Sequence, residues 1–220
     1  MRIQKKKRPP QFRPTAEAAS AAPGAAVLET VRFGPDQNAT PADYEPGDFI
    51  LTYSSGFSGK LIRLGQWLRY SGEDKKYIRW NHAAIIETAE GDLIEAVGTG
   101  VRRVHISHYG PTEYVIVRVG SFTKPEDREQ IVAFAQWCLG EQYGYTTIFS
   151  IGLNLLTGCK FTFGIDGQSI CSGMVARALE RTNAIFQTTP SHVAPADLAK
   201  FFDIPAPTWL GAKPELQPAG

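Results

Sequence analysis

The chain has 220 residues, a formal net charge of +1, 43% hydrophobic residues and 20% charged residues. This composition is typical of a single soluble globular domain, and it excludes binding to nucleic acid or acidic lipid through overall charge. Three cysteines with no Cys-x-x-Cys pair argue against a disulfide framework and against a structural zinc site.

The first 44 residues are rich in Ala, Pro, Gly and charge, which predicts a flexible arm. Its basic run at residues 5–8 could contact nucleic acid or anionic lipid, but a solvated tail is the favoured interpretation. Residues 14–26 lack the continuous apolar segment of a signal peptide, and the stretch 148–163 is too polar to span a bilayer. We therefore expect a chain that is cytoplasmic by default, or one delivered by a phage particle or another route outside general secretion.

The folded domain is predicted over residues 45–205, followed by a tail over 206–220. It opens at Pro46-Gly47-Asp48 and continues into a short strand over 49–51. Further predicted strands are 82–87, 92–97, 101–106 and 114–119, and predicted helices are 58–70, 125–139, 146–156, about 170–182 and 195–202. This order predicts an α+β fold in which a small antiparallel sheet packs against helices.

Cys171 stands at the predicted start of a helix, after the turn-rich approach Asp166-Gly167-Gln168-Ser169. The unpaired amides and the positive dipole end of a helix N-terminus favour a thiolate, which is the nucleophilic form of cysteine. Cys159 is the rival nucleophile, but it lacks this helix-start context, and Cys138 is predicted to be packing on an apolar helix face. Cys171 is therefore the candidate nucleophile.

A cysteine nucleophile needs a base and a group that orients the base. His82 lies in a predicted strand, which holds a side chain more rigidly than a loop does, although a hydrogen-bonded core histidine is the simpler interpretation. Glu95 lies in an otherwise apolar strand, where a carboxylate is costly unless it has a partner, and an outward-facing position is the alternative. Residues 82 and 95 can meet across the hairpin if the register allows it.

Other residues have weaker functional interpretations. His105 and His108 could suggest a metal, but their spacing places them on opposite sides of a strand, and we predict no metal site. Tyr143 and Tyr145 could line a cleft, although plain packing is favoured. The amphiphilic stretch 146–163 could form a lipid-facing lid, with a buried helix and loop as the favoured interpretation.

Four segments, PGDFILT, NHAAIIETAEGDLIEA, GTGVRRV and CSGMV, resemble the core of the NlpC/P60 papain-like hydrolases. The cysteine helix follows the sheet here instead of preceding it, an order that resembles the circularly permuted branch containing YiiX-like and lecithin retinol acyltransferase-like proteins. The resemblance covers residues 46–200. It implies a permuted papain-like fold with Cys171 as nucleophile, His82 as base and Glu95 in the third position, which is often histidine in the conventional branch.

The resemblance implies a thiol hydrolase, of cysteine-peptidase type, that cleaves amide bonds in peptidoglycan stem peptides or related peptides through an acyl-enzyme. The backbone amide of Cys171, with Gln168 or Tyr53, would stabilise the oxyanion. Two alternatives stay open: an acyltransferase or thioesterase acting on lipid-linked acyl groups, and a binding or scaffold module with a vestigial triad. The expected partner is a peptide or acyl substrate, with no cofactor and no nucleic acid.

Overall fold

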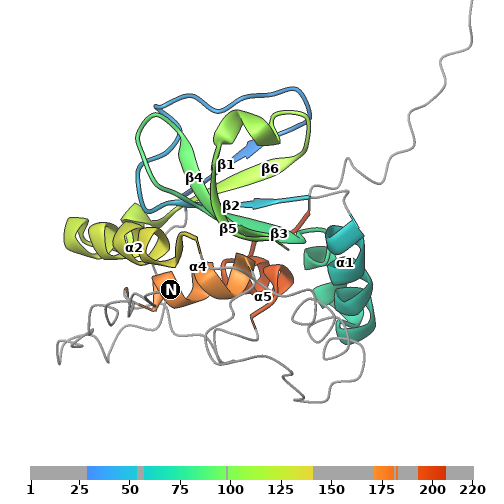
Figure 1. Cartoon of the computed structure of the whole chain (residues 1–220). Helices are drawn as coiled ribbons and strands as arrows, with labels where there is room; N and C mark the ends of the chain where they lie inside the picture. The colour runs from blue at the N-terminus through green and yellow to red at the C-terminus, as the bar shows by residue number, and fades with distance from the viewer. Residues whose placement is uncertain are drawn as a thin grey trace, which may run out of the picture.

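The computed structural model describes residues 29–53, 57–97, 99–140, 171–180, 182 and 193–206. These residues form an α+β fold with one six-stranded antiparallel sheet of strand order β1-β6-β2-β3-β4-β5 (Figure 1). The strands are β1 (Glu29–Phe33), β2 (Phe49–Thr52), β3 (His82–Ile86), β4 (Asp92–Val97), β5 (Gly100–His105) and β6 (Tyr114–Arg118). The α-helices are α1 (Phe57–Arg69), α2 (Pro125–Cys138), α4 (Cys171–Leu179) and α5 (Pro195–Phe201), and the 3-10 helices are η2 (Gly72–Tyr77), η3 (Ile106–Tyr109) and η4 (Val119–Ser121).

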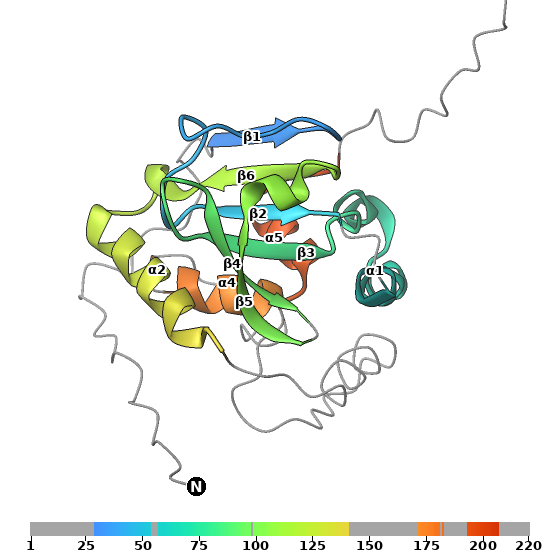
Figure 2. The same ribbon diagram turned by 45° about the horizontal axis from the view of Figure 1, so that its top comes forward.

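The two faces of the sheet carry two separate apolar clusters. One face, with Leu51, Ile85 and Ile94, packs against α2, α4 and α5, whose residues share the same buried cluster. The other face, with Ile50 and Ile86, is covered by chain from η3 and from the segment before β2. Helix α4 lies against the sheet (Figure 2), and its residues are buried along almost its whole length, which fixes the position of the helix.

The turn that opens β2 explains the Pro-Gly-Asp sequence. Gly47 has φ +93°, and a β-carbon there would lie 3.1 Å from Cβ of Arg128, so glycine is required on both counts. Asp48 is fully buried and accepts backbone hydrogen bonds from Glu45 at 2.8 Å and Val119 at 2.9 Å. Arg128 of α2 lies 3.0 Å from the same carboxylate, so this turn ties β2 to α2.

The hairpin between β3 and β4 matches its sequence prediction. Gly91 has φ +98°, and a β-carbon there would lie only 2.6 Å from the hydroxyl of Tyr44. The register pairs Ala84 with Glu95 and Ile86 with Leu93. This register places Glu95 on the same face of the sheet as His82, two residues before Ala84.

The other predicted elements within the described ranges are also present, with ends that differ by at most three residues. The prediction of an arm as far as residue 44 is wrong over residues 29–33, which form β1 and pair with β6. An edge strand has a neighbour on one side only, so the sequence ETVRF carries no strong apolar signal. The predicted helix 146–156, residues 1–28 and the tail from 207 onward lie outside the described residues.

Across the described part of the chain, no helix combines the length and the apolar character needed to cross a bilayer.

Candidate active site

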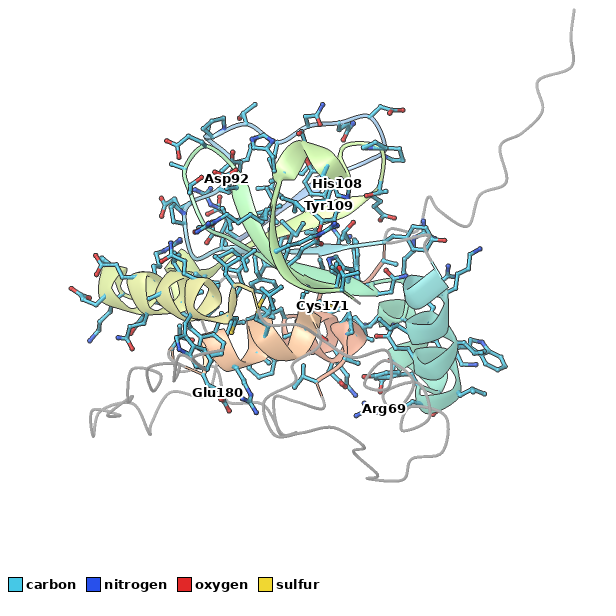
Figure 3. All side chains as sticks on the ribbon, in the orientation of Figure 1. Arg69, Asp92, His108, Tyr109, Cys171 and Glu180 are labelled. Carbon is cyan, nitrogen blue, oxygen red and sulfur yellow. The ribbon has the colours of Figure 1, made fainter. Side chains whose placement is uncertain are left out.

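The cysteine of the CSGMV sequence is the first residue of α4, and its side chain is buried against the sheet (Figure 3). Burial raises the pKa of the Cys171 thiol, but the charge of His82 and a hydrogen bond from its ring lower it. The backbone N–H groups of Ala83 and Ser172 also donate to the sulfur and lower the pKa further. The net direction is a lowered pKa, which favours the thiolate.

The sheet supplies one of these donors because β3 and β4 separate at this point. Along an antiparallel strand, alternate N–H groups point to the same neighbour, and Glu87 donates to Asp92 on the β4 side at 2.7 Å. The N–H of Ala83 therefore points toward β4 as well. The pairing of β3 with β4 begins only at the next residue, where Ala84 pairs with Glu95. The freed N–H of Ala83 is satisfied by the sulfur instead.

His82 lies at the first position of β3 and contacts both the sulfur and a carboxylate. Its Nε2 is 2.6 Å from Oε2 of Glu95, a diagonal cross-strand contact permitted by the observed register. Because Nε2 is engaged by Glu95, Nδ1 is the ring nitrogen left to face Cys171. Burial opposes a charge on the ring, but Cys171 and Glu95 outweigh it, so the pKa of His82 is raised. The two shifts together favour a thiolate–imidazolium pair.

The carboxylate of Glu95 is fixed at both of its oxygens. Oε1 accepts from Nε of Arg102 at 2.8 Å, whereas Oε2 accepts from the hydroxyl of Tyr109 in addition to His82. Burial and Glu95 raise the pKa of Tyr109, so its hydroxyl stays a donor. Burial would raise the pKa of Glu95, but His82, Tyr109 and Arg102 lower it to about 2. The carboxylate is therefore ionised and cannot rotate away from the imidazole.

Sequence reasoning missed Tyr109 and Arg102. Arg102 stands in the GTGVRRV segment, directly opposite Glu95 in the β4–β5 register, so a correct pairing of these strands would have found it. Tyr109 comes from η3, which crosses back over the sheet (Figure 3), and no local pattern indicates that approach. It lies 3.2 Å from Nε2 of His82 as well as beside Glu95.

The remaining predicted site residues are not all placed by the structure. Tyr53 follows β2, and the guanidinium groups of Arg63 and Arg79 lie over its ring, 5.0 Å and 4.6 Å from the ring centroid. Its hydroxyl accepts from Nη1 of Arg63 at 3.0 Å, which leaves the O–H proton available to donate elsewhere. The other candidates lie outside the described residues: Gln168, Tyr143, Tyr145 and the rival nucleophile Cys159.

The two histidines considered for a metal make local contacts instead. His105 bonds through its ring nitrogens to Ser107 at 2.8 Å and to the carbonyl of Glu90 at 2.9 Å. The ring of His108 meets that of Tyr109 edge-on, with centroids 5.3 Å apart. Within the described ranges, no group of three or more His, Cys, Asp and Glu side chains is placed to hold a metal ion.

The Glu95 contacts predict a loss of stability in acid. The pKa of Glu95 falls from 4.5 to about 2 on folding, so the unfolded chain binds more protons between these values. The contribution is therefore complete above pH 4.5 and disappears as the pH falls toward 2; it amounts to roughly 3 kcal/mol. In urea unfolding, Glu95→Gln should be destabilising at pH 7 and much less so, relative to the unchanged chain, at pH 3.

The matched control for this prediction is Glu129→Gln, which removes an exposed carboxylate on α2. It should change the free energy of unfolding by less than about 0.5 kcal/mol at both pH values. An equal penalty for Glu95→Gln at pH 7 and pH 3 would contradict the assignment of the low pKa to this side chain.

Comparison with known proteins gives a distant structural likeness. No family model matches the chain, and no curated protein matches its sequence. Among solved structures, the chain is similar to the crystal structure of the metalloprotein yiiX from Escherichia coli O157:H7, DUF1105, with 18% sequence identity and a TM-score of 0.44. The match covers 62% of this chain and 65% of that one, so it spans less than two thirds of either. The residues described above therefore carry the functional assignment by themselves.

Proposed function

We propose that this chain is a papain-like cysteine hydrolase of circularly permuted order, with Cys171 as nucleophile, His82 as general base and acid, and Glu95 as the group that orients His82. One observation carries the proposal: a buried sulfur and a buried carboxylate contact the same imidazole, and both shifts of pKa favour the ionised forms. A core histidine with a purely structural role has no need of a cysteine at a helix start as its second partner.

The order of the elements supports the permuted assignment. The histidine strand β3 and the carboxylate strand β4 both precede α4 in the chain, whereas the conventional family order places the cysteine helix first. The packing requires only that the start of α4 meets the start of β3, and a long connection can bring them together from either direction.

The reaction follows from these positions. The Cys171 thiolate attacks a carbonyl carbon, and the negative charge moves to the carbonyl oxygen, which the N–H of Cys171 and a donor such as Gln168 or Tyr53 would stabilise. His82 then gives its proton to the leaving amine as the carbon–nitrogen bond breaks. In the second half, His82 takes a proton from water as the resulting hydroxide attacks the thioester carbon. The carbon–sulfur bond then breaks, and the Cys171 thiolate leaves beside the imidazolium, which restores the starting pair and releases the acid.

Tyr109 and Arg102 act as positioning residues in this mechanism. Both donate hydrogen bonds to the carboxylate of Glu95. Their contribution is to keep the carboxylate of Glu95 charged, so that the His82 imidazolium stays paired with it before substrate binds.

The proposed substrate is an amide bond in a peptidoglycan-type or related peptide, and the open alternative is an acyl group on a thioester or lipid carrier. The test is incubation of the protein with purified muropeptides and, separately, with acyl thioesters of several chain lengths, followed by mass spectrometry of products and of the intact protein. We expect cleavage of one class and a mass increase on Cys171 that matches the acyl part of that substrate. Cleavage of thioesters alone would contradict the amidase assignment and favour the thioesterase alternative. Cleavage without any acylated protein would contradict the covalent mechanism.

A further inference from the structure

Among the described residues of α1, a buried polar side chain and a glycine carbonyl attach the helix to the body of the protein. Gln66 is fully buried and donates to the carbonyls of Ile78 at 3.1 Å and Trp80 at 2.9 Å. Its own side-chain oxygen accepts from the N–H of Ala196 at 2.9 Å, and the carbonyl of Gly59 accepts from Asn81 at 3.0 Å. This is the reverse of an ordinary surface helix, which buries its apolar stripe.

Three large apolar side chains of α1 face outward instead. Leu64, Trp67 and Leu68 are 48%, 52% and 50% exposed, and among the described residues they are the large hydrophobic side chains that stand out as exposed. Their spacing of three and four residues places them on one continuous stripe of the helix. Three such side chains exposed together are costly in water, whereas single ones are normal, so the stripe indicates an interaction surface.

The charges that α1 itself carries have one sign. Helix α1 contains Lys60, Arg63 and Arg69 and no acidic residue. Residues 57–77, which include η2, contain five basic and two acidic residues, a net +3 in a chain whose total is +1. Nζ of Lys75 in η2 lies 5.1 Å above the ring of Trp67, so a cation directly borders the apolar stripe.

We propose that this face of α1, made of Leu64, Trp67 and Leu68 with the flanking Lys60 and Lys75, docks onto an anionic phospholipid surface. Such a helix lies in the plane of the membrane interface with its apolar side chains below the headgroups, where tryptophan is favoured and basic side chains meet the lipid phosphates. A second copy of the chain is a less suitable partner for this face, because it would bring two basic faces together and like charges repel. Three side chains also offer far less than the roughly 800 Å² per partner that a stable interface buries.

Helix α1, which carries the docking surface, lies beside the candidate active site. Helix α1 follows β2, whose last residue Thr52 pairs with His82, and Asn81, the neighbour of His82, bonds to the first turn of α1. Figures 1 and 2 both show α1 standing at this end of the sheet. Docking would therefore bring the site next to the membrane surface. The inference does not rest on the proposed function, because binding is read without turnover.

The test is co-sedimentation of the full chain with vesicles of phosphatidylcholine alone and of phosphatidylcholine with 30% phosphatidylglycerol. We expect binding to the second kind only, weakened by 0.5 M salt. The double variant Leu64→Gln with Leu68→Gln should bind at least about tenfold less, since it removes most of the buried apolar area. Lys60→Glu should also weaken binding, whereas Lys124→Glu, the same charge change at the start of α2, should not. Equal thermal unfolding of all variants shows that the fold is kept.

The less favoured interpretation of the basic run at residues 5–8 is contact with anionic lipid. The depth to which Trp67 inserts must therefore be measured separately. Lipids brominated on the acyl chains should quench tryptophan fluorescence in the unchanged chain, and Trp67→Phe should remove most of that quenching. Retained binding in the Leu64 and Leu68 variant, or quenching that survives Trp67→Phe, would overturn the proposal in favour of attachment by the arm. Self-association in gel filtration that the double variant abolishes, without vesicle binding, would overturn it in favour of a second copy.

Discussion

Replacing Cys171 by alanine is expected to lower the rate of hydrolysis by about a thousandfold or more, because Cys171 is the one thiol that contacts His82 among the described residues. The fold should survive, since the cysteine is small and the remaining residues of α4 stay buried in the same cluster. The measurement is the initial rate on the substrate identified by mass spectrometry, together with the thermal unfolding midpoint. The acyl adduct on the intact protein should disappear in the same variant.

Cys138→Ala is the matched control, because Cys138 is the other buried cysteine within the described residues. It lies at the end of α2 in the apolar cluster, so its removal should cost some stability and leave the rate almost unchanged. Wild-type turnover in Cys171→Ala would refute the assignment of the nucleophile. A large loss of rate in Cys138→Ala with an unchanged unfolding midpoint would mean that Cys138 takes part in the reaction, and it would contradict its use as a control.

Replacing His82 by alanine is expected to make Cys171 unreactive toward iodoacetamide at mildly acid pH. Burial raises the pKa of this thiol, and the imidazolium of His82 is the largest influence that lowers it. Without His82, the effect of burial should therefore dominate and raise the pKa. A thiol whose pKa lies at or above about 9 is thiolate to only about one part in a thousand at pH 6, so the alkylation rate there should fall by two to three orders of magnitude. The measurement is the alkylation rate between pH 4 and 9, with peptide mapping to separate the three cysteines.

His105→Ala is the control for this experiment, because it removes a histidine that bonds to Ser107 and Glu90 and contacts neither the sulfur nor Glu95 in the structure. It should leave the pH profile of Cys171 unchanged. A profile in His82→Ala that still shows a rapidly alkylated thiol at pH 6 would mean that the Ala83 and Ser172 donors alone keep the sulfur ionised, and the imidazole would lose its place in the mechanism.

The exposed stripe on α1 and the candidate site can be separated experimentally. Variants at Leu64 and Leu68 address membrane docking, and variants at Cys171 and His82 address chemistry, with no residue shared between the two sets. Failure of vesicle binding would leave the hydrolase proposal standing, and an inactive Cys171 site would leave the docking proposal standing.

The secondary structure was largely predictable from the sequence because its signals are local. Apolar spacing indicated the helices over 57–69 and 125–138, and the Gly91 turn indicated the hairpin that carries His82 and Glu95. The helix-start position of Cys171 was equally readable from the sequence that surrounds it. Edge strand β1 escaped prediction because its pairing partner lies more than eighty residues away, and its own sequence shows no comparable pattern.

The amino-acid sequence by itself determined which residue types are available for thiol chemistry and that a hairpin could bring His82 near Glu95. Only the tertiary structure decided the register that makes them diagonal neighbours, the gap beside β3 that frees the Ala83 N–H for the sulfur, and the approach of Tyr109 to Glu95. It also decided that α1 turns Gln66 inward and Trp67 outward, since both orientations satisfy the same helical period. Periodicity fixes which side chains share a face, whereas the partner of that face is set by contacts between distant segments, which no local pattern contains.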